Sequence, residues 1–168
     1  MRGAPTRGAP RPTWKLLEAA VYELLIEGIP APQGSKSVSR RTGQMFEVAK
    51  ALPAWKRAMS SALIQYRHSL GGVDPYSGPV VLTAHFLMPR PKAHYRTGRF
   101  AHVLKDSAPE HHTQKPDGDK LVRALMDSLT REGFLTDDCI VTRGVWEKRW
   151  AEYGETSGVW FTLRGKGE

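Results

Sequence analysis

The sequence predicts a single α+β domain, in which a mixed sheet of about four or five strands packs against two main helices. Two observations predict this class. Stretches rich in β-branched and aromatic residues, typical of strands, are separated by two runs whose apolar residues recur at helical spacing. The 168 residues suffice for one domain, and an apolar content of 40% suffices for a hydrophobic core.

The first half of the chain predicts one strand, one loop and one helix. Residues 21–27 (VYELLIE) predict the strand, and the Gly-, Pro- and Ser-rich residues 28–44 predict the loop. Residues 53–70 predict the helix, because Pro53 suits the first helical position and a Gly-Gly pair ends the run. Its apolar stripe is more typical of a core than of a binding face and comprises Trp55, Met59, Leu63 and Tyr66.

The second half predicts a strand, a helix and two further strands. Residues 79–88 (PVVLTAHFLM) predict the strand. Residues 119–131 predict the helix, which has an apolar row of leucines four apart and is followed by Gly133, a good C-terminal cap. Residues 139–150 and 158–164 predict two strands, which we expect to pair as a final hairpin.

Two stretches near the N-terminus carry basic residues without acidic ones. Residues 1–13 contain three arginines with abundant Gly and Pro, which predicts a disordered basic arm or a start-site extension ahead of a domain over 14–168. The loop at 28–44 carries Lys36, Arg40 and Arg41. Two interpretations stay open for it: a solvated hairpin loop, or a loop whose cations bind phosphates.

A long irregular segment at 89–116 separates the third expected strand from the second helix. Loops of this length inside a compact domain are usually functional or disordered. Basic residues interleaved with aromatic ones favour a nucleic-acid-binding loop, while a dispensable insertion is the alternative. The basic and aromatic members are Arg90, Lys92, Tyr95, Arg96, Arg99, Phe100, Lys105 and Lys115.

Charge and composition narrow the function classes. The formal net charge of +8 favours an anionic partner, with nucleic acid ahead of a membrane surface or an acidic protein. No apolar run approaches the ~20 residues of a membrane span. The first residues lack the apolar segment of a secretory signal, so no such signal is expected. A single cysteine, Cys139, excludes an internal disulfide and a multi-cysteine zinc site, so we expect a reducing, cytoplasmic location.

Three aspartates form the candidate chemical site: Asp117, Asp119 and Asp138. Asp117 and Asp119 flank one residue at the start of the second helix, so in an extended chain both carboxylates leave the same side and can share a hard divalent cation such as Mg²⁺. The helix is about 18 Å long at 1.5 Å per residue, so Asp138 reaches the pair only if the returning segment is nearly extended. The alternative is purely structural: Asp117 caps the helix, Asp119 is a favourable acid in its first turn, and Asp137-Asp138 forms a turn before a strand.

Other polar residues are less suited to a metal site. A zinc site at His111, His112 and Cys139 is disfavoured, because adjacent histidines point in different directions on most backbones. His85 lies within an apolar strand and is interpreted as a hydrogen-bonded core residue. Asp127 is two helical turns from Asp119, about 12 Å along the axis, and is therefore interpreted as structural.

The segment 115–141 carries a recognisable pattern: KPDGDKL, then LMDSL, then GF and TDDCIV. The pattern has three parts: an Asp-x-Asp, a helix with an Asp-Ala-Leu-like step, and an Asp-Asp before an apolar strand. These parts follow one another at the intervals seen in the RusA-like Holliday junction resolvases, which are common in bacteriophages and prophages. The sequence therefore resembles that family here. Weaker support comes from residues 29–41 and 81–89.

The resemblance implies a small homodimeric, Mg²⁺-dependent endonuclease that cuts four-way DNA junctions by paired symmetric nicks, with Mn²⁺ expected to substitute for Mg²⁺. The family's metal-binding aspartates fall on Asp117, Asp119 and Asp138. Its catalytic lysine falls on Arg123, which keeps a positive charge near phosphate but cannot lose its proton to act as a base. The expected DNA contacts are Lys36, Arg40, Arg41, Lys115 and Lys120.

Two other functions stay open at this point. One is a non-catalytic DNA-binding relative, which the arginine at position 123 keeps in consideration. The other is a nuclease that prefers flaps or forks. In each case the partner is branched DNA, and neither a membrane nor an organic cofactor is expected.

Overall fold

The computed structural model describes residues 20–34, 36–38, 45–47 and 50–165. The expected basic arm at 1–13 lies outside these residues, as do Arg40 and Arg41. Within the described residues no helix is both long and apolar enough to cross a bilayer.

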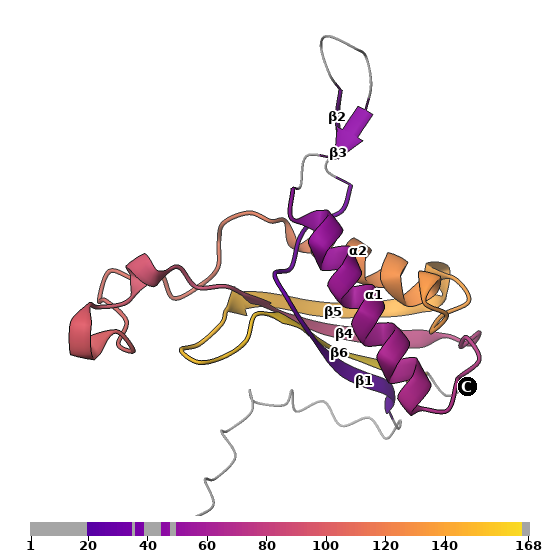
Figure 1. The fold of residues 1–168 in the computed structure, drawn as a ribbon. Helices are drawn as coiled ribbons and strands as arrows, with labels where there is room; N and C mark the ends of the chain where they lie inside the picture. The colour runs from indigo at the N-terminus through magenta and orange to yellow at the C-terminus, as the bar shows by residue number, and fades with distance from the viewer. Residues whose placement is uncertain (1–19, 35, 39–44, 48–49, 166–168) are drawn as a thin grey trace, which may run out of the picture.

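A four-stranded mixed sheet forms the centre of the domain (Figure 1). The strands are β1 (Ala20–Glu27), β4 (Val80–Met88), β5 (Val141–Trp150) and β6 (Gly158–Gly165). Their order is β1-β6-β4-β5, with β4 and β5 parallel and the other pairs antiparallel. This confirms the α+β class and the predicted mixed sheet.

The predicted final hairpin is wrong, because β5 and β6 are not neighbours. β6 pairs with β1 and β4, so β4 lies between β6 and β5. Burial gives the reason: β4 and β6 are apolar and largely buried, whereas β5 is exposed over most of its length and carries Arg, Glu and Lys side chains. Strands with charged, solvated side chains suit the edge of a sheet, and buried strands suit its middle.

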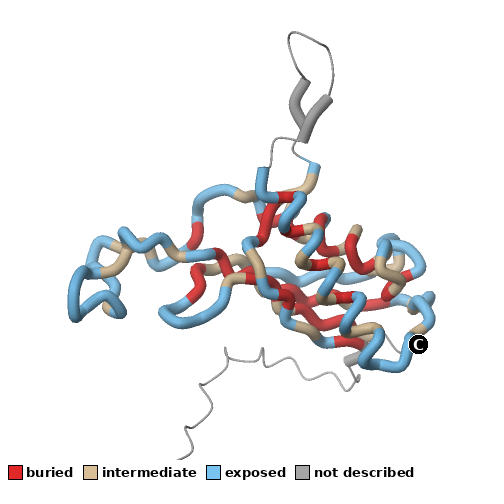
Figure 2. The backbone as a smooth tube through the Cα atoms, viewed as in Figure 1, coloured by how far each residue is buried: buried red, intermediate tan, exposed pale blue. Residues whose placement is uncertain are grey.

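Two helices pack on one face of the sheet, as Figure 1 shows. They are α1 (Leu52–Ser69) and α2 (Gly118–Arg131). α1 buries Trp55, Met59 and Leu63 as the helical spacing predicts, and α2 buries its leucine row. α1 lies against β1 and α2 against β5, with the core between the helices and the sheet (Figure 2).

Part of the predicted 28–44 loop is a small ladder. β2 (Lys36–Val38) pairs antiparallel with β3 (Met45–Glu47). This two-stranded sheet stands apart from the main sheet (Figure 1). Lys36 is therefore the first residue of a strand.

The long segment after β4 is an arm that projects beyond the end of the sheet (Figure 1). It contains two short 3₁₀ helices, η1 (Lys92–His94) and η2 (Gly98–Phe100). Most of it is exposed, in contrast to the buried strands that it follows (Figure 2). The chain then returns through residues 111–116 to the start of α2.

Candidate active site

The two first aspartates of the motif lie at the start of α2. Asp117 is the residue before the helix and Asp119 is in its first turn. Both are exposed. Asp117 occupies the N-cap position and Asp119 is an acid of the first turn, as the structural alternative expects, but the Asp117 side chain makes no capping hydrogen bond. Its Oδ2 lies 3.1 Å from Lys120 Nζ instead.

Two features of β5 fix the position of this helix start. A Cβ atom at Gly118 would lie 2.1 Å from Cζ3 of Trp146, so the indole occupies the space that any larger residue would need. Lys148 Nζ donates to the carbonyl oxygens of Gln114, at 2.7 Å, and Pro116, at 2.8 Å. The glycine between the two aspartates therefore packs closely against the indole, a role that the sequence pattern alone did not indicate.

A hollow of about 360 Å³ lies beside Asp117. Lys115 and Lys120, both predicted to bind DNA, line it together with the carboxylate. Lys50, just before α1, also lines the hollow. Sequence reasoning missed this residue because it lies 65 positions before Lys115, and no local pattern relates the two. The apolar side of the hollow is formed by Ile29, Pro30, Ala31, Pro32, Ala51, Met88 and Pro116. The structure thus places three ammonium groups around a hollow with one carboxylate in its wall.

The segment after β1 packs along the polar side of α2. Gln33 N donates to the Lys120 carbonyl at 3.1 Å, and Gln33 Nε2 donates to Asp127 Oδ2. Gly34 lies close to the exposed Arg123, since a Cβ atom there would be 3.0 Å from the guanidinium Nη1. Asp127 therefore has a structural partner, as its position two turns from Asp119 predicts.

Asp138 lies in the segment between α2 and β5. It begins η3 (Asp138–Ile140), where the preceding Asp137 accepts a hydrogen bond from Cys139 N at 2.8 Å. The pKa of Asp138 is raised by its local burial, then by a hydrogen bond with Asp137 and by the negative charges of Asp137 and Asp127. Asp127, which acts on Asp138 through its charge, lies in the second half of α2, two turns beyond Asp119.

The donor chemistry suits Mg²⁺, since exposed carboxylates are hard oxygen ligands. The grouping within one chain is incomplete, however. Among the described residues, no three His, Cys, Asp or Glu side chains gather closely enough to hold an ion. The three candidate aspartates therefore do not form a complete ligand cluster among the residues that the structure describes.

His112, considered for zinc, and His85, interpreted as a core residue, have different surroundings. His112 is buried, with its ring centroid 4.2 Å from that of Trp150. Its pKa is lowered by burial and then by the charge of Lys148. His85 is half-buried on the open face of the sheet and shares a 2.6 Å hydrogen bond with Glu147, so it is hydrogen-bonded as predicted but not part of the core.

Residues 27–157 match the family model described as endodeoxyribonuclease RusA. The match covers well over half of the chain. The chain belongs to the RusA endodeoxyribonuclease family.

The matched span gives this RusA-family chain a function class. It contains all three candidate aspartates, Arg123 and the projecting arm. Membership implies an endonuclease that acts on DNA and resolves Holliday junctions. A search of curated proteins finds no match.

Proposed function

We propose that this RusA-family protein is a Mg²⁺-dependent endonuclease that resolves four-way DNA junctions by paired symmetric nicks as a homodimer. The observation that supports this best is the start of α2, where Asp117 and Asp119 lie beside a hollow lined by Lys50, Lys115 and Lys120. An anionic DNA backbone is attracted by the lysines, and the two carboxylates offer ligands for a divalent cation that would promote phosphodiester hydrolysis.

In this proposal Asp117, Asp119 and Asp138 hold the metal. When bound, Mg²⁺ supplies Lewis-acid polarisation of a phosphate oxygen and lowers the pKa of water. The ion pair between Lys120 and Asp117 holds the two side chains in place before DNA binds. If the Asp117 carboxylate held a cation, the Lys120 ammonium group would be free to contact a phosphate.

A homodimer supplies what one chain lacks. Among the described residues of one chain, the three aspartates do not form a complete ligand cluster. A two-fold dimer presents a second Asp138, and it relates two sites by the same kind of axis that relates two strands of a four-way junction. The paired nicks follow from that symmetry.

Arg123 has an electrostatic role in this proposal. It is exposed on α2 one turn after Asp119, and Gly34 leaves room for its guanidinium group. A guanidinium group stabilises negative charge that develops on phosphate oxygens, but it does not accept a proton. The proton from the attacking water therefore leaves by another route than Arg123.

The test is nicking of a labelled synthetic four-way junction by the full chain, with binding measured separately in EDTA. Asp119→Asn and Asp138→Asn should each reduce Mg²⁺-dependent nicking by about a thousandfold or more, since a metal contributes several kcal/mol to the transition state. Asp74→Asn, at an exposed acid outside the site, is the matched control and should nick normally.

Three outcomes decide between the candidate functions. Full cleavage by either site variant would remove the metal-site assignment. Tight binding without any nicking by the wild-type chain would favour the non-catalytic relative, for which Arg123 is the motivating residue. Faster cleavage of flap or fork substrates than of four-way junctions would assign the nuclease to those structures.

A further inference from the structure

We infer that residues 89–110 and the turn at 151–157 form a second DNA-binding surface, which stacks unpaired bases of branched DNA on Phe100 and Tyr153. The inference rests on the proposed function for its choice of DNA as the partner. The surface lies outside the hollow at the start of α2, so the two can be tested separately.

The arm that carries Phe100 is a built structure held by its own hydrogen bonds. Tyr95 and Leu104 form an antiparallel bridge, with Arg96 N donating to the Val103 carbonyl at 2.8 Å. Lys105 N donates to the His94 carbonyl at 2.9 Å. The tip residues between these contacts are therefore presented in a fixed geometry.

Trp150, the last residue of β5, anchors the arm to the sheet. The indole is buried and its Nε1 donates to the His111 carbonyl at 3.1 Å. The rings of His94 and His112 have centroids 5.2 Å and 4.2 Å from that of Trp150, and the Arg90 guanidinium carbon lies 5.5 Å from the indole centroid. This cluster fixes the arm at the end of the sheet from which the chain continues to Asp117.

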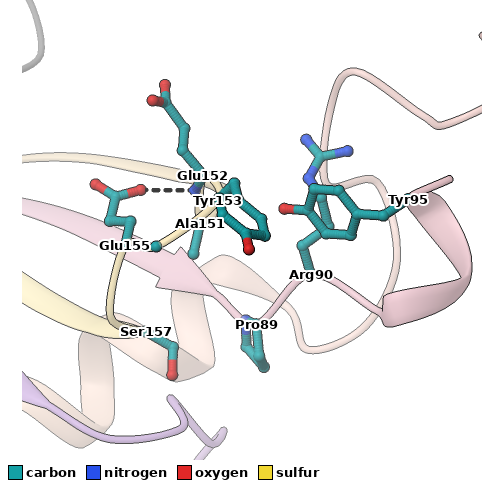
Figure 3. Close-up of a pocket in the computed structure, with 9 residues that line it drawn as sticks. Pro89, Arg90, Tyr95, Ala151, Glu152, Tyr153, Glu155 and Ser157 are labelled. Atoms are coloured by element: carbon teal, nitrogen blue, oxygen red, sulfur yellow. Dashed lines mark hydrogen bonds between the residues drawn. The ribbon is translucent and has the colours of Figure 1, made fainter. Parts of the chain in front are cut away.

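Exposed aromatic rings gather on this surface. Phe100 is 46% exposed and Tyr153 is 65% exposed, and among the described residues Trp146 is the one other aromatic of comparable exposure. The Tyr153 ring touches Tyr95, with centroids 5.8 Å apart, and these two line a hollow of about 260 Å³ with Arg90 (Figure 3). The rings contribute little to the core, so their open faces are available to a ligand.

Cations accompany the rings. The Arg99 guanidinium carbon lies 4.7 Å from the Phe100 ring centroid. Residues 89–110 hold five basic residues against two acidic ones, and the acid Asp106 is paired with Arg96 at 3.1 Å. On the facing turn Glu155 is paired with Arg149 at 2.7 Å. The turn at 151–157 also carries Glu152, so the two segments together hold five basic and four acidic residues. The positive charge that an anionic partner would meet beside the rings is that of Arg90 and Arg99.

The combination favours unpaired DNA over a paired duplex or an acidic protein. Cations alone would suit any of the three partners. Exposed rings beside cations are the arrangement that binds single strands, because every base has a stacking face and a duplex hides these faces. A branch point is where a junction offers bases that are free to unstack.

The test measures binding of the full chain in EDTA to a fluorescent oligo-dT strand and to a four-way junction. Phe100→Ala and Tyr153→Ala should each weaken oligo-dT binding by between about 5-fold and about 100-fold. Tyr153→Phe keeps the ring and should bind as wild type. Leu70→Ala, which removes a side chain of similar exposure after α1, is the matched control and should also bind as wild type.

A charge variant separates stacking from attraction. Arg99→Gln should reduce the slope of log affinity against log salt by about 0.7 for a single strand. Wild-type binding by both alanine variants would overturn the inference and leave the arm as a surface for another partner. Normal strand binding by a wild-type chain that does not nick junctions would instead contradict the proposed function while supporting this surface.

Discussion

The start of α2 and the projecting arm lie at the same end of the sheet, yet they are held in different ways. The helix start is fixed on two sides, by close packing of Gly118 against Trp146 and by the hydrogen bonds of Lys148 to the chain before the helix. The arm is anchored by one cluster, in which the indole of Trp150 contacts His94 and the buried His112. A site that does chemistry needs tight placement of its ligands, whereas a surface that captures flexible strands tolerates a single anchor.

Loss of the anchor should give the largest effect. Trp150→Ala removes a 5% exposed indole that contacts Arg90, His94 and His112, so we expect a loss of about 3–5 kcal/mol in the free energy of unfolding. Urea denaturation measures this loss. Hydrogen exchange should show the arm opening while α2 stays protected.

Trp150→Phe is the control for this prediction, because it keeps a ring between the two histidines. It should retain most of the stability. Equal exchange of the arm and of α2 in the alanine variant would contradict the view that they are held independently.

Crowding at the helix start should give an intermediate effect. Gly118→Ala places a Cβ atom 2.1 Å from the Trp146 ring, so the indole must rotate away, and we expect a cost of about 1–3 kcal/mol. Because Trp146 is 46% exposed and has room to move, the lower end of that range is expected. Nicking should fall, while oligo-dT binding by the arm should not.

A double variant gives the sharper form of this prediction. In a Trp146→Ala background the clash is absent, so Gly118→Ala should cost nothing in urea denaturation. An equal cost in both backgrounds would show that the glycine matters for another reason.

Acidification should give the smallest effect, and it should act on the arm. Burial and the charge of Lys148 lower the pKa of His112 below 6.5, so the unfolded state binds the proton more readily than the folded state does. The stability that the neutral ring contributes is fully present above pH 6.5 and is lost as the pH falls toward the folded pKa. Hydrogen exchange of the arm, corrected for intrinsic rates, should therefore increase between pH 7.5 and pH 5.5.

His112→Phe keeps a ring against Trp150 but removes the titration. The pH dependence of arm exchange should shrink in this variant. An undiminished dependence would assign the effect to another group.

The elements that sequence reasoning located well are those whose signals are local. The leucine row of α2, the stop after α1 and the apolar strand β4 each depend on spacing within a few residues, and the structure confirms them. The final hairpin failed because strand pairing is decided by which strands are buried on both sides. Adjacent strands in the sequence usually pair, but β5 is too polar to lie in the middle of this sheet.

The candidate site shows the same contrast between features set by local sequence and features set by distant contacts. The sequence predicted that Asp117 and Asp119 lie at the same helix start, because only one residue separates them. Neither the part played by Lys50 nor the need for glycine at 118 follows from any local pattern, since both depend on residues far along the chain. The position of Asp138 also depends on the path between α2 and β5.

By itself the sequence determined the helices, the strong strands, the acidic motif and the family, because these depend on periodicity, turn residues and fixed short intervals. The tertiary structure alone decided the strand order, the anchoring of the arm on Trp150 and the close packing of Gly118 against Trp146. The physical reason is that burial and side-chain contacts between distant segments are properties of the whole packed chain. No short stretch of residues specifies them.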